Sequence, residues 1–268
     1  MGEAGMSTTL DIVSPEQKAS ADFYGQYFWK NYDVRDAGFL RFIVDHVGHD
    51  YLTAASTLLD IGAGSGKFSI LLKRAYPHLR IEALDLSPDN IRTIEANAAS
   101  AEVDVTATEG SALDLPYESA SFDIVLCVYM LQHTPDPRRG FLEAARVLKP
   151  GGTSLYAIGR ENGLGRVHTK TRAMLGYVPA ALRRSTVLPF VPLYWSLLKV
   201  TGSRKASESD LTIDLVDWLY NPLTKFVQDS DIPVWFDQAG LSYTPLGYTG
   251  LMKSMHICRG IKREGRSA

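Results

Sequence analysis

The 268-residue sequence predicts an α/β protein built on a doubly wound, mostly parallel sheet. Apolar strand-like runs alternate with segments of helical spacing through five successive strands. A glycine-rich turn at residues 62–66 joins the first strand to the first helix of this alternation. Apart from Asp123, the run Phe122–Tyr129 is apolar, as expected for a strand buried on both faces of a parallel sheet.

The elements follow from these patterns in chain order. Residues 1–14 are small and polar without a period, so we expect them to be loosely attached. Between Pro15 and Val47, aromatic and aliphatic residues fall at helical spacings and predict two helices, separated near Asn31–Asp33. The five expected strands are Thr57–Ile61, Ile81–Asp85, Val103–Thr108, Phe122–Tyr129 and Thr153–Ile158. The expected helices between them are Lys67–Tyr76, one capped by Ser87, and one that begins at Asp136–Pro137 and ends at Lys149–Gly152.

The alternation stops at residue 159, and glycine turns, basic clusters and a proline-broken apolar segment predict a helical insertion up to residue 230. Residues 231–241 then predict a helix ended by glycine, followed by strands at Leu241–Leu246 and roughly Lys253–Gly260. We therefore expect four parts: an N-terminal helical cap (1–50), a cofactor-binding core (51–158), an insertion that forms an acceptor lid (159–230) and a C-terminal completion of the sheet (231–268).

The composition is that of an ordinary soluble protein, with a formal net charge of −2, and argues against a nucleic-acid partner. Cys127 and Cys258 lie far apart in apolar runs without metal-ligand spacing, so we expect buried reduced thiols and no metal site. With no recognisable signal peptide, these features favour a cytoplasmic protein.

The most membrane-like segment is Val187–Val200. It is shorter than the roughly 20 residues of a spanning helix, and Pro189 and Pro192 interrupt it, so we expect no integral membrane segment. One interpretation is a helix packed on the core. The other is a peripheral membrane contact or a surface for a lipophilic substrate, since Arg183 and Arg184 precede it.

The turn after the first strand points to a bound small molecule. Glycines at 62, 64 and 66 remove Cβ atoms where a ligand would lie against the backbone. A dinucleotide fingerprint needs a sixth-position glycine, where Lys67 stands, and the spacing of a P-loop is also missing. Instead, Asp60 precedes the glycines and Asp85 ends the next strand. With these features the chain resembles the class I S-adenosylmethionine-dependent methyltransferases, in particular those that act on small molecules.

The resemblance implies a Rossmann-like sheet of seven strands with the last strand antiparallel, covered by a lid made of the N-terminal helices and the insertion. It also implies that S-adenosyl-L-methionine is the cofactor. Asp60 would orient the turn or bind the ammonium group, and Asp85 would accept hydrogen bonds from the ribose hydroxyls. The cofactor-binding residues expected on this basis are Asp60, Gly62, Ala63, Gly64, Gly66, Asp85, Leu86, Ser111, Ala112, Leu113, Val128, Gln132 and His133, with Tyr24 and Tyr27 from the N-terminal helix.

Two further segments carry the resemblance. Glu109–Tyr117 is similar to the family segment in which an aspartate meets the adenine amino group, but Ser111 stands in place of that aspartate. Cys127–Pro137 is similar to the segment ending in His-x-x-Asp and would put His133 and Tyr129 beside the sulfonium, as candidate catalytic residues. A neutral His133 imidazole would accept a proton from the acceptor; alternatively it shapes the loop.

The acceptor pocket should come from the N-terminal helices and the insertion. Residues 217–222 and 235–240 are similar to an Asp-Trp-aromatic-x-x-Pro and a Trp-Phe-x-x-Ala-Gly pattern in a branch linked to sugar, lipid or natural-product biosynthesis. The substrate-binding candidates are Tyr32, His168, Trp218 and Tyr220. Simple lid packing is the alternative for these aromatic residues.

Three functional hypotheses remain. The first is in-line methyl transfer to an oxygen or nitrogen atom of a small organic acceptor, promoted by proximity and by possible base assistance from His133. The second is a nicotinamide-dependent (NAD) oxidoreductase, which Lys67 disfavours. The third is a non-catalytic protein that keeps the cofactor fold.

Overall fold

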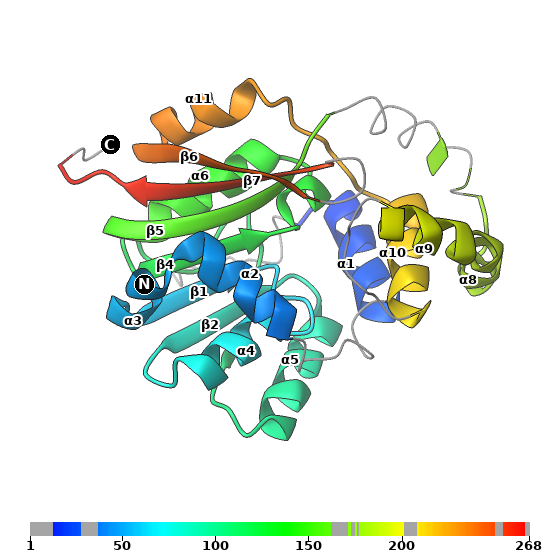
Figure 1. Cartoon of the computed structure of the whole chain (residues 1–268), viewed down its shortest axis with the longest axis horizontal. Helices are drawn as coiled ribbons and strands as arrows, with labels where there is room; N and C mark the ends of the chain where they lie inside the picture. The colour runs from blue at the N-terminus through cyan, green and yellow to red at the C-terminus, as the bar shows by residue number, and fades with distance from the viewer. Residues whose placement is uncertain are drawn as a thin grey trace, which may run out of the picture.

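A seven-stranded sheet with helices on both faces forms the centre of the computed structural model (Figure 1). The structure describes residues 13–27, 37–161, 171–172, 175, 177–200, 208–249 and 254–265. The strands are β1 (Thr57–Ile61), β2 (Arg80–Asp85), β3 (Thr106–Glu109), β4 (Phe122–Val128), β5 (Leu148–Gly159), β6 (Leu241–Thr249) and β7 (Met255–Lys262). Their order in the sheet is β3-β2-β1-β4-β5-β7-β6.

The sheet confirms the predicted fold class. Strands β1 to β5 pair in parallel, and β7 runs antiparallel to both β5 and β6. The chain reverses its winding direction between β1 and β4, and ligands bind outside the carboxyl ends of the strands at such a switch point. The glycine turn lies at that point, immediately after β1.

Helices cover the sheet in two layers. Helices α2 (Ala37–Val47), α3 (His49–Ala54), α4 (Lys67–Ala75) and α5 (Pro88–Ser100) lie on one face, whereas α6 (Pro137–Val147) and α11 (Asp231–Gln238) lie on the other (Figure 1). Each layer buries its own apolar cluster against the sheet, and fully buried aromatic side chains of Phe141, Tyr156 and Phe236 dominate the one beneath α6 and α11. Cys127 and Cys258 are free and buried, as expected.

Several boundaries differ from the expected ones; β6, for example, extends to Thr249 rather than Leu246, and β7 covers Met255–Lys262. Lys149–Gly152, which we expected to end a helix, belongs to the start of β5, because the helix already stops at Val147. The pairing of β4 with β5 shifts register between Phe122 and Ile124, and this irregularity accommodates the extra residues. Strand β3 begins at Thr106 rather than Val103, after a turn in which Glu102 has a positive φ of 55°.

A helical layer stands across the carboxyl ends of the parallel strands (Figure 1). It contains α1 (Pro15–Tyr27), α8 (Ala180–Val187), the 3-10 turn η3 (Leu188–Phe190), α9 (Val191–Val200) and α10 (Glu208–Tyr220). Phe23 of α1 packs in one apolar cluster with Val187, Val191 and residues of α10, which joins the N-terminal helix to the insertion. We call these elements the lid. None of the helices in the described ranges has the length and apolar character needed to span a bilayer.

Candidate functional site

The glycine turn is built for close backbone contact. Gly62, Gly64 and Gly66 have φ angles of 72°, 58° and 74°, a left-handed conformation that a side chain disfavours. The amide of Gly62 donates to the Leu84 carbonyl over 2.7 Å, which ties the turn to β2. A Cβ on Gly62 would come within 2.7 Å of the Met130 side chain. The turn is therefore held between β2 and the loop that follows β4.

Two buried carboxylates hold the turn from below. The Asp60 carboxylate accepts a 2.7 Å hydrogen bond from the Ser69 hydroxyl, and burial raises the pKa of Asp60 to about 6. The Asp85 carboxylate accepts from the amides of Gly64 and Ser87, each over 2.9 Å, and from the Asn90 side chain over 3.1 Å. Burial raises the pKa of Asp85, while these bonds act in the opposite direction. Both residues therefore orient the turn in the protein itself.

The predicted adenine segment lies beside β2, where the Gly110 amide donates to the Asp85 carbonyl. The Ser111 hydroxyl accepts a 3.2 Å bond from the Leu113 amide and a 3.3 Å bond from the Gln17 side chain of α1. Gln17 and Ser111 are both buried, at 4% exposed. Helix α1 thus reaches the adenine segment, a contact that the sequence did not predict.

The loop after β4 carries the candidate catalytic residues. Tyr129 has a φ of 63°, uncommon for a residue with a large side chain, and its ring stacks on Phe42 of α2 at 6.3 Å. The short helix η2 (Leu131–His133) follows, and the side-chain amide of Gln132 donates to the Tyr129 carbonyl over 2.7 Å.

Both ring nitrogens of His133 have close neighbours. Its Nδ1 lies 3.1 Å from the Leu223 carbonyl, and its Nε2 lies 3.1 Å from the Gln132 amide nitrogen. A neutral ring whose Nδ1–H donates to the Leu223 carbonyl and whose Nε2 accepts from the Gln132 side chain satisfies these two contacts. The Asn221 side-chain nitrogen lies 2.9 Å from the same Nδ1, and in this arrangement it gives its two protons to Tyr24 and Asp217. Burial lowers the pKa of His133, which favours this neutral form.

A polar cluster, which we call the lid cluster, joins α1, α10 and η2. Its members are Tyr24, His133, Asp217 and Asn221. The Tyr24 hydroxyl lies 3.0 Å from the Asp217 carboxylate, and the Asn221 amide lies within 2.9 Å of Asp217, Tyr24 and His133. Burial, followed by the charge of Asp217, raises the pKa of Tyr24 well above its usual range, and the charge of Asp85 adds to the effect. The Tyr24 hydroxyl therefore lies within electrostatic range of the turn's carboxylate.

The lid cluster contains residues that the sequence analysis did not single out. Asp217 and Asn221 belong to the Asp-Trp-aromatic-x-x-Pro pattern, from which the sequence predicts only the aromatic residues Trp218 and Tyr220 as substrate-binding residues. Asn221 is fully buried, and its side-chain oxygen accepts from the Leu223 amide over 2.9 Å. A polar residue beside a proline at the end of an aromatic helix is the signal that could have found it.

The other predicted residues are distributed as follows. Tyr220 packs within the lid, 4% exposed, with its hydroxyl 2.6 Å from that of Thr186 on α8. Trp218 is half-buried on α10. Tyr32 and His168 lie outside the described residues, as does the side chain of Tyr27. The structure thus brings Tyr24 to the lid cluster and places the Tyr220 hydroxyl against α8.

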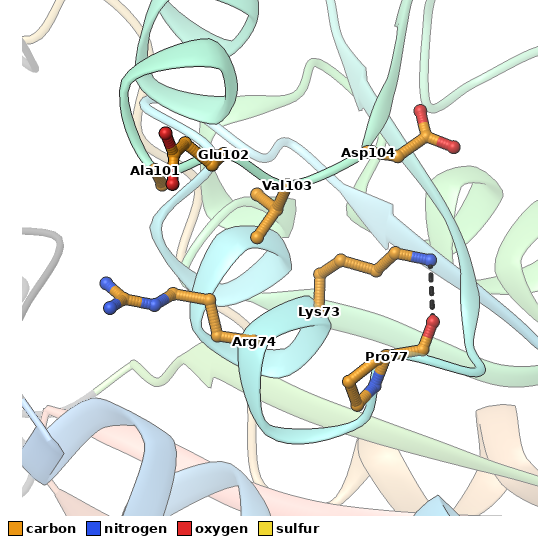
Figure 2. A pocket seen from close by; sticks show the side chains of 7 residues that line it. All are labelled: Lys73, Arg74, Pro77, Ala101, Glu102, Val103 and Asp104. Carbon is orange, nitrogen blue, oxygen red and sulfur yellow. Dashed lines mark hydrogen bonds between the residues drawn. The ribbon is translucent and has the colours of Figure 1, made fainter.

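The remaining predicted cofactor contacts come from ends of neighbouring strands. They follow β1, β2 or β3 or end β4, and except for the partly buried Leu86 they are buried: Ala63, Leu86, Ala112, Leu113 and Val128. A separate hollow lies at the amino-terminal edge of the sheet, where Lys73 and Pro77 of the α4–β2 connection face residues 101–104 (Figure 2). The Lys73 amine donates to the Pro77 and Leu79 carbonyls there. That hollow is at the opposite sheet edge from the glycine turn.

The residues at the turn fit an adenosyl cofactor with an amino-acid tail. The backbone is free of Cβ atoms where such a ligand must approach, and carboxylates suited to hydroxyl and ammonium groups lie on either side. The Ser65 hydroxyl of the turn is buried and has no hydrogen-bond partner in the described part of the chain, so it remains available to a ligand. Ser111 supplies a neutral acceptor in place of a carboxylate.

Part of the chain is similar to known proteins. Residues 59–156 match the model of a methyltransferase domain. Demethylmenaquinone methyltransferase of Deinococcus radiodurans is 37% identical over 95 residues, covering 35% of this chain and 39% of that protein. Ubiquinone biosynthesis O-methyltransferase of Xanthomonas oryzae pv. oryzae is 34% identical over 110 residues, covering 41% of this chain and 45% of that protein. The matched part thus spans less than half of these relatives.

The fold comparison extends further along the chain than the sequence matches. An O-methyltransferase family protein from Burkholderia thailandensis superposes with a TM-score of 0.55 and 18% identity, covering 87% of this chain and 58% of that one. At this identity the similarity concerns the fold alone.

Proposed function

Since residues 59–156 form a methyltransferase domain of the class I, S-adenosylmethionine-dependent fold, we propose that the whole protein transfers a methyl group from S-adenosyl-L-methionine to an oxygen or nitrogen atom of a small organic acceptor. The observation that carries the proposal is the convergence of the glycine turn, Asp85 and the Ser111 segment at the carboxyl edge of β1, β2 and β3, beneath α1. The domain match favours methyl transfer over hydride transfer.

The residues that would hold the cofactor divide by its chemical parts. Gly62–Gly66, Ser65 and Asp60 would face the tail and ribose, and Asp85 would accept hydrogen bonds from the ribose hydroxyls. Leu86 with residues 111–113 would enclose the adenine. When bound, S-adenosylmethionine supplies a methyl group on a positively charged sulfur. Tyr24 and Gln132 would border that end, together with Val128 and Tyr129.

The chain's own contribution is positioning, exclusion of water and proton handling. Helix α1 spans the site from Gln17 at the Ser111 segment to Tyr24 beside His133, and a lid in this place keeps water from the reacting groups. Tyr24 stays protonated because of its raised pKa, so it would donate a hydrogen bond rather than act as a base. His133 is neutral and would accept the acceptor's proton at Nε2 once the Gln132 amide turns away.

The acceptor is a small organic molecule, and we infer that the insertion at 159–230 encloses it. The two relatives named above are, by their names, enzymes of quinone methylation and biosynthesis, which supports a lipophilic acceptor. The "O-methyltransferase" in the second name favours an oxygen atom. Buried, unbridged Cys127 and Cys258 support a reducing compartment, the cytoplasm.

Calorimetric titration with S-adenosylmethionine and with its demethylated product tests the cofactor half of the proposal. We expect both to bind and NADH not to bind. Ser65→Ala should leave the melting temperature of the free protein unchanged or higher, and should weaken binding by ~0.5–1.5 kcal/mol, the worth of one hydrogen bond. Ser121→Ala, before β4 at the opposite edge, is the matched control.

Asp85→Ala is the stronger perturbation. It should cost ~1.5–3 kcal/mol of cofactor binding, as for hydrogen bonds to a charged group. The same change leaves the Gly64 and Ser87 amides without their acceptor, so the melting temperature of the free variant must be measured alongside. Binding of NADH but not of S-adenosylmethionine by the wild type would refute the proposal.

A further inference from the structure

Exposed apolar side chains concentrate on one part of the lid. Among the described residues, eight large hydrophobic side chains are exposed, and six of them lie between residues 177 and 195. Leu182, Phe190 and Leu193 are 54%, 57% and 70% exposed, and Leu188 and Trp195 are 44% and 46% exposed. We call these five residues of α8, η3 and α9 the outer face. Concentrated apolar exposure of this kind marks a surface that contacts another phase or molecule.

The opposite side of α8 and α9 is buried in the apolar core of the lid. Val187 and Val191 are 0% and 5% exposed and pack with Phe23 of α1 and with α10. The outer face is therefore the side of these helices turned away from that core, and α8 and α9 stand at the end of the molecule remote from the sheet (Figure 1). Its residues do not complete the lid's own core.

The charge of the same stretch is equally uneven. Residues 162–207 contain eight lysines and arginines and no aspartate or glutamate, a formal charge of +8. The whole chain has a formal charge of −2, so the residues outside 162–207 together carry −10. Arg184 is exposed on α8 beside the outer face, while the neighbouring Arg183 packs its guanidinium over the Tyr220 ring. A basic, apolar segment on an otherwise acidic protein selects a partner that is negatively charged and apolar together.

We propose that the outer face docks on the surface of an anionic lipid bilayer, with its apolar side chains in the headgroup region and Arg184 facing lipid phosphates. Helices that lie in an interface combine Trp, Phe and Leu with Lys and Arg in this way. None of the helices in the described part of the chain is able to cross the membrane, so the contact is peripheral. Nucleic acid would satisfy the charge but leaves Leu182, Leu188 and Leu193 in water. The proposal stands apart from the methyl-transfer reaction.

Sedimentation with sucrose-loaded vesicles tests the proposal with the full-length chain. We expect the protein to sediment with vesicles of phosphatidylcholine and phosphatidylglycerol in equal parts, to stay in the supernatant with phosphatidylcholine alone, and to be released by high salt. Arg184→Gln should weaken binding about fivefold, corresponding to the loss of one basic residue near the surface. The double variant Phe190→Ser/Leu193→Ser should weaken it roughly tenfold or more.

Val234→Ser is the matched control, because Val234 is an exposed apolar residue, 52% exposed, on α11. It should sediment like the wild type. All substituted residues are exposed, and circular dichroism with S-adenosylmethionine titration checks that each variant is folded. The proposal is overturned if the protein does not sediment with vesicles, or sediments equally with both vesicle types. It is also overturned if Val234→Ser weakens vesicle binding as much as the outer-face variants do. A homodimer in sedimentation equilibrium that the Phe190→Ser/Leu193→Ser variant dissociates would assign the outer face to a second copy of the chain instead.

Discussion

The carboxyl group of Asp60 is 2% exposed at the end of β1, and its burial gives the protein a specific dependence of stability on pH. Its pKa of about 6 in the folded chain exceeds the ordinary 3.8, so the folded state binds the Asp60 proton more tightly than the unfolded state. The unfolding free energy that protonated Asp60 contributes is present at low pH, and it is lost as the pH rises from about 4 to the pKa of about 6 that Asp60 has in the folded chain. Above about pH 6 the loss is complete, because both states are then ionised.

Asp60→Asn removes this dependence. The amide oxygen still accepts from Ser69, and the new N–H groups add a cost that does not vary with pH. The difference between a pKa of about 6 and 3.8 corresponds to about 3 kcal/mol, at ~1.4 kcal/mol for each tenfold change in acid constant. Between about pH 4 and pH 7 we therefore expect the wild type to lose up to about 3 kcal/mol of unfolding free energy relative to Asp60→Asn.

Urea denaturation of both proteins at closely spaced pH values, followed by circular dichroism, measures this difference directly. Asp123→Asn is the control of opposite sign. Burial raises the pKa of Asp123, but hydrogen bonds from Lys149 and Thr57 outweigh it and leave the pKa lowered, so Asp123 contributes stability that is lost as pH falls. Stability profiles of Asp60→Asn and wild type that run parallel between pH 4 and pH 7 would refute the reasoning.

Three further predictions address the site and the lid. Gly62→Ala should cost at least ~1–2 kcal/mol of stability in thermal unfolding, because the residue has a left-handed φ and its Cβ would meet Met130 at 2.7 Å. Gly265→Ala is the control: at φ 86° with open space around it, it measures the cost of the left-handed backbone without the steric clash. Asn221→Asp puts a second carboxylate beside Asp217, and two carboxylates this close favour uptake of a proton. The unfolding free energy that the variant loses relative to wild type, measured by urea denaturation, should therefore shrink as pH falls; a loss that stays constant with pH would contradict this. Tyr24→Phe removes a donor to Asp217 and should speed amide exchange in α1 measured by mass spectrometry, while Tyr177→Phe, 90% exposed, should not.

The sheet was predictable because its signals are local. An apolar run with glycines behind it specifies β1 with the bounds Thr57–Ile61, and Ser87 with Pro88 marks the start of α5, as the structure shows. Where the signal was ambiguous, the boundary was wrong. Lys149–Gly152 reads as a helix stop, yet these residues belong to β5, as the irregular stretch between the partners of Phe122 and Ile124 on β4, and such pairing cannot be read from one segment alone.

The polar contacts of the lid were not predictable for a related reason. Tyr24 and Asn221 are separated by 197 positions, and Gln17 and Ser111 by 94. Neither pair has a spacing that a helix or strand period would reveal. Ser111 illustrates the consequence: it stands where the resembled family has an aspartate, and only the folded chain shows that the Gln17 side-chain amide lies 3.3 Å from its hydroxyl.

These contacts make α1 a connector between both ends of the proposed cofactor site. Its Gln17 touches the adenine segment, and its Tyr24 joins the lid cluster beside His133. Helix α1 is therefore held at two points, one at each end of the proposed site. Because Asn221 binds Tyr24 and also accepts from the Leu223 amide, opening of α1 loosens the segment whose carbonyl holds the His133 ring. Cofactor entry and the orientation of the candidate base are for this reason expected to change together.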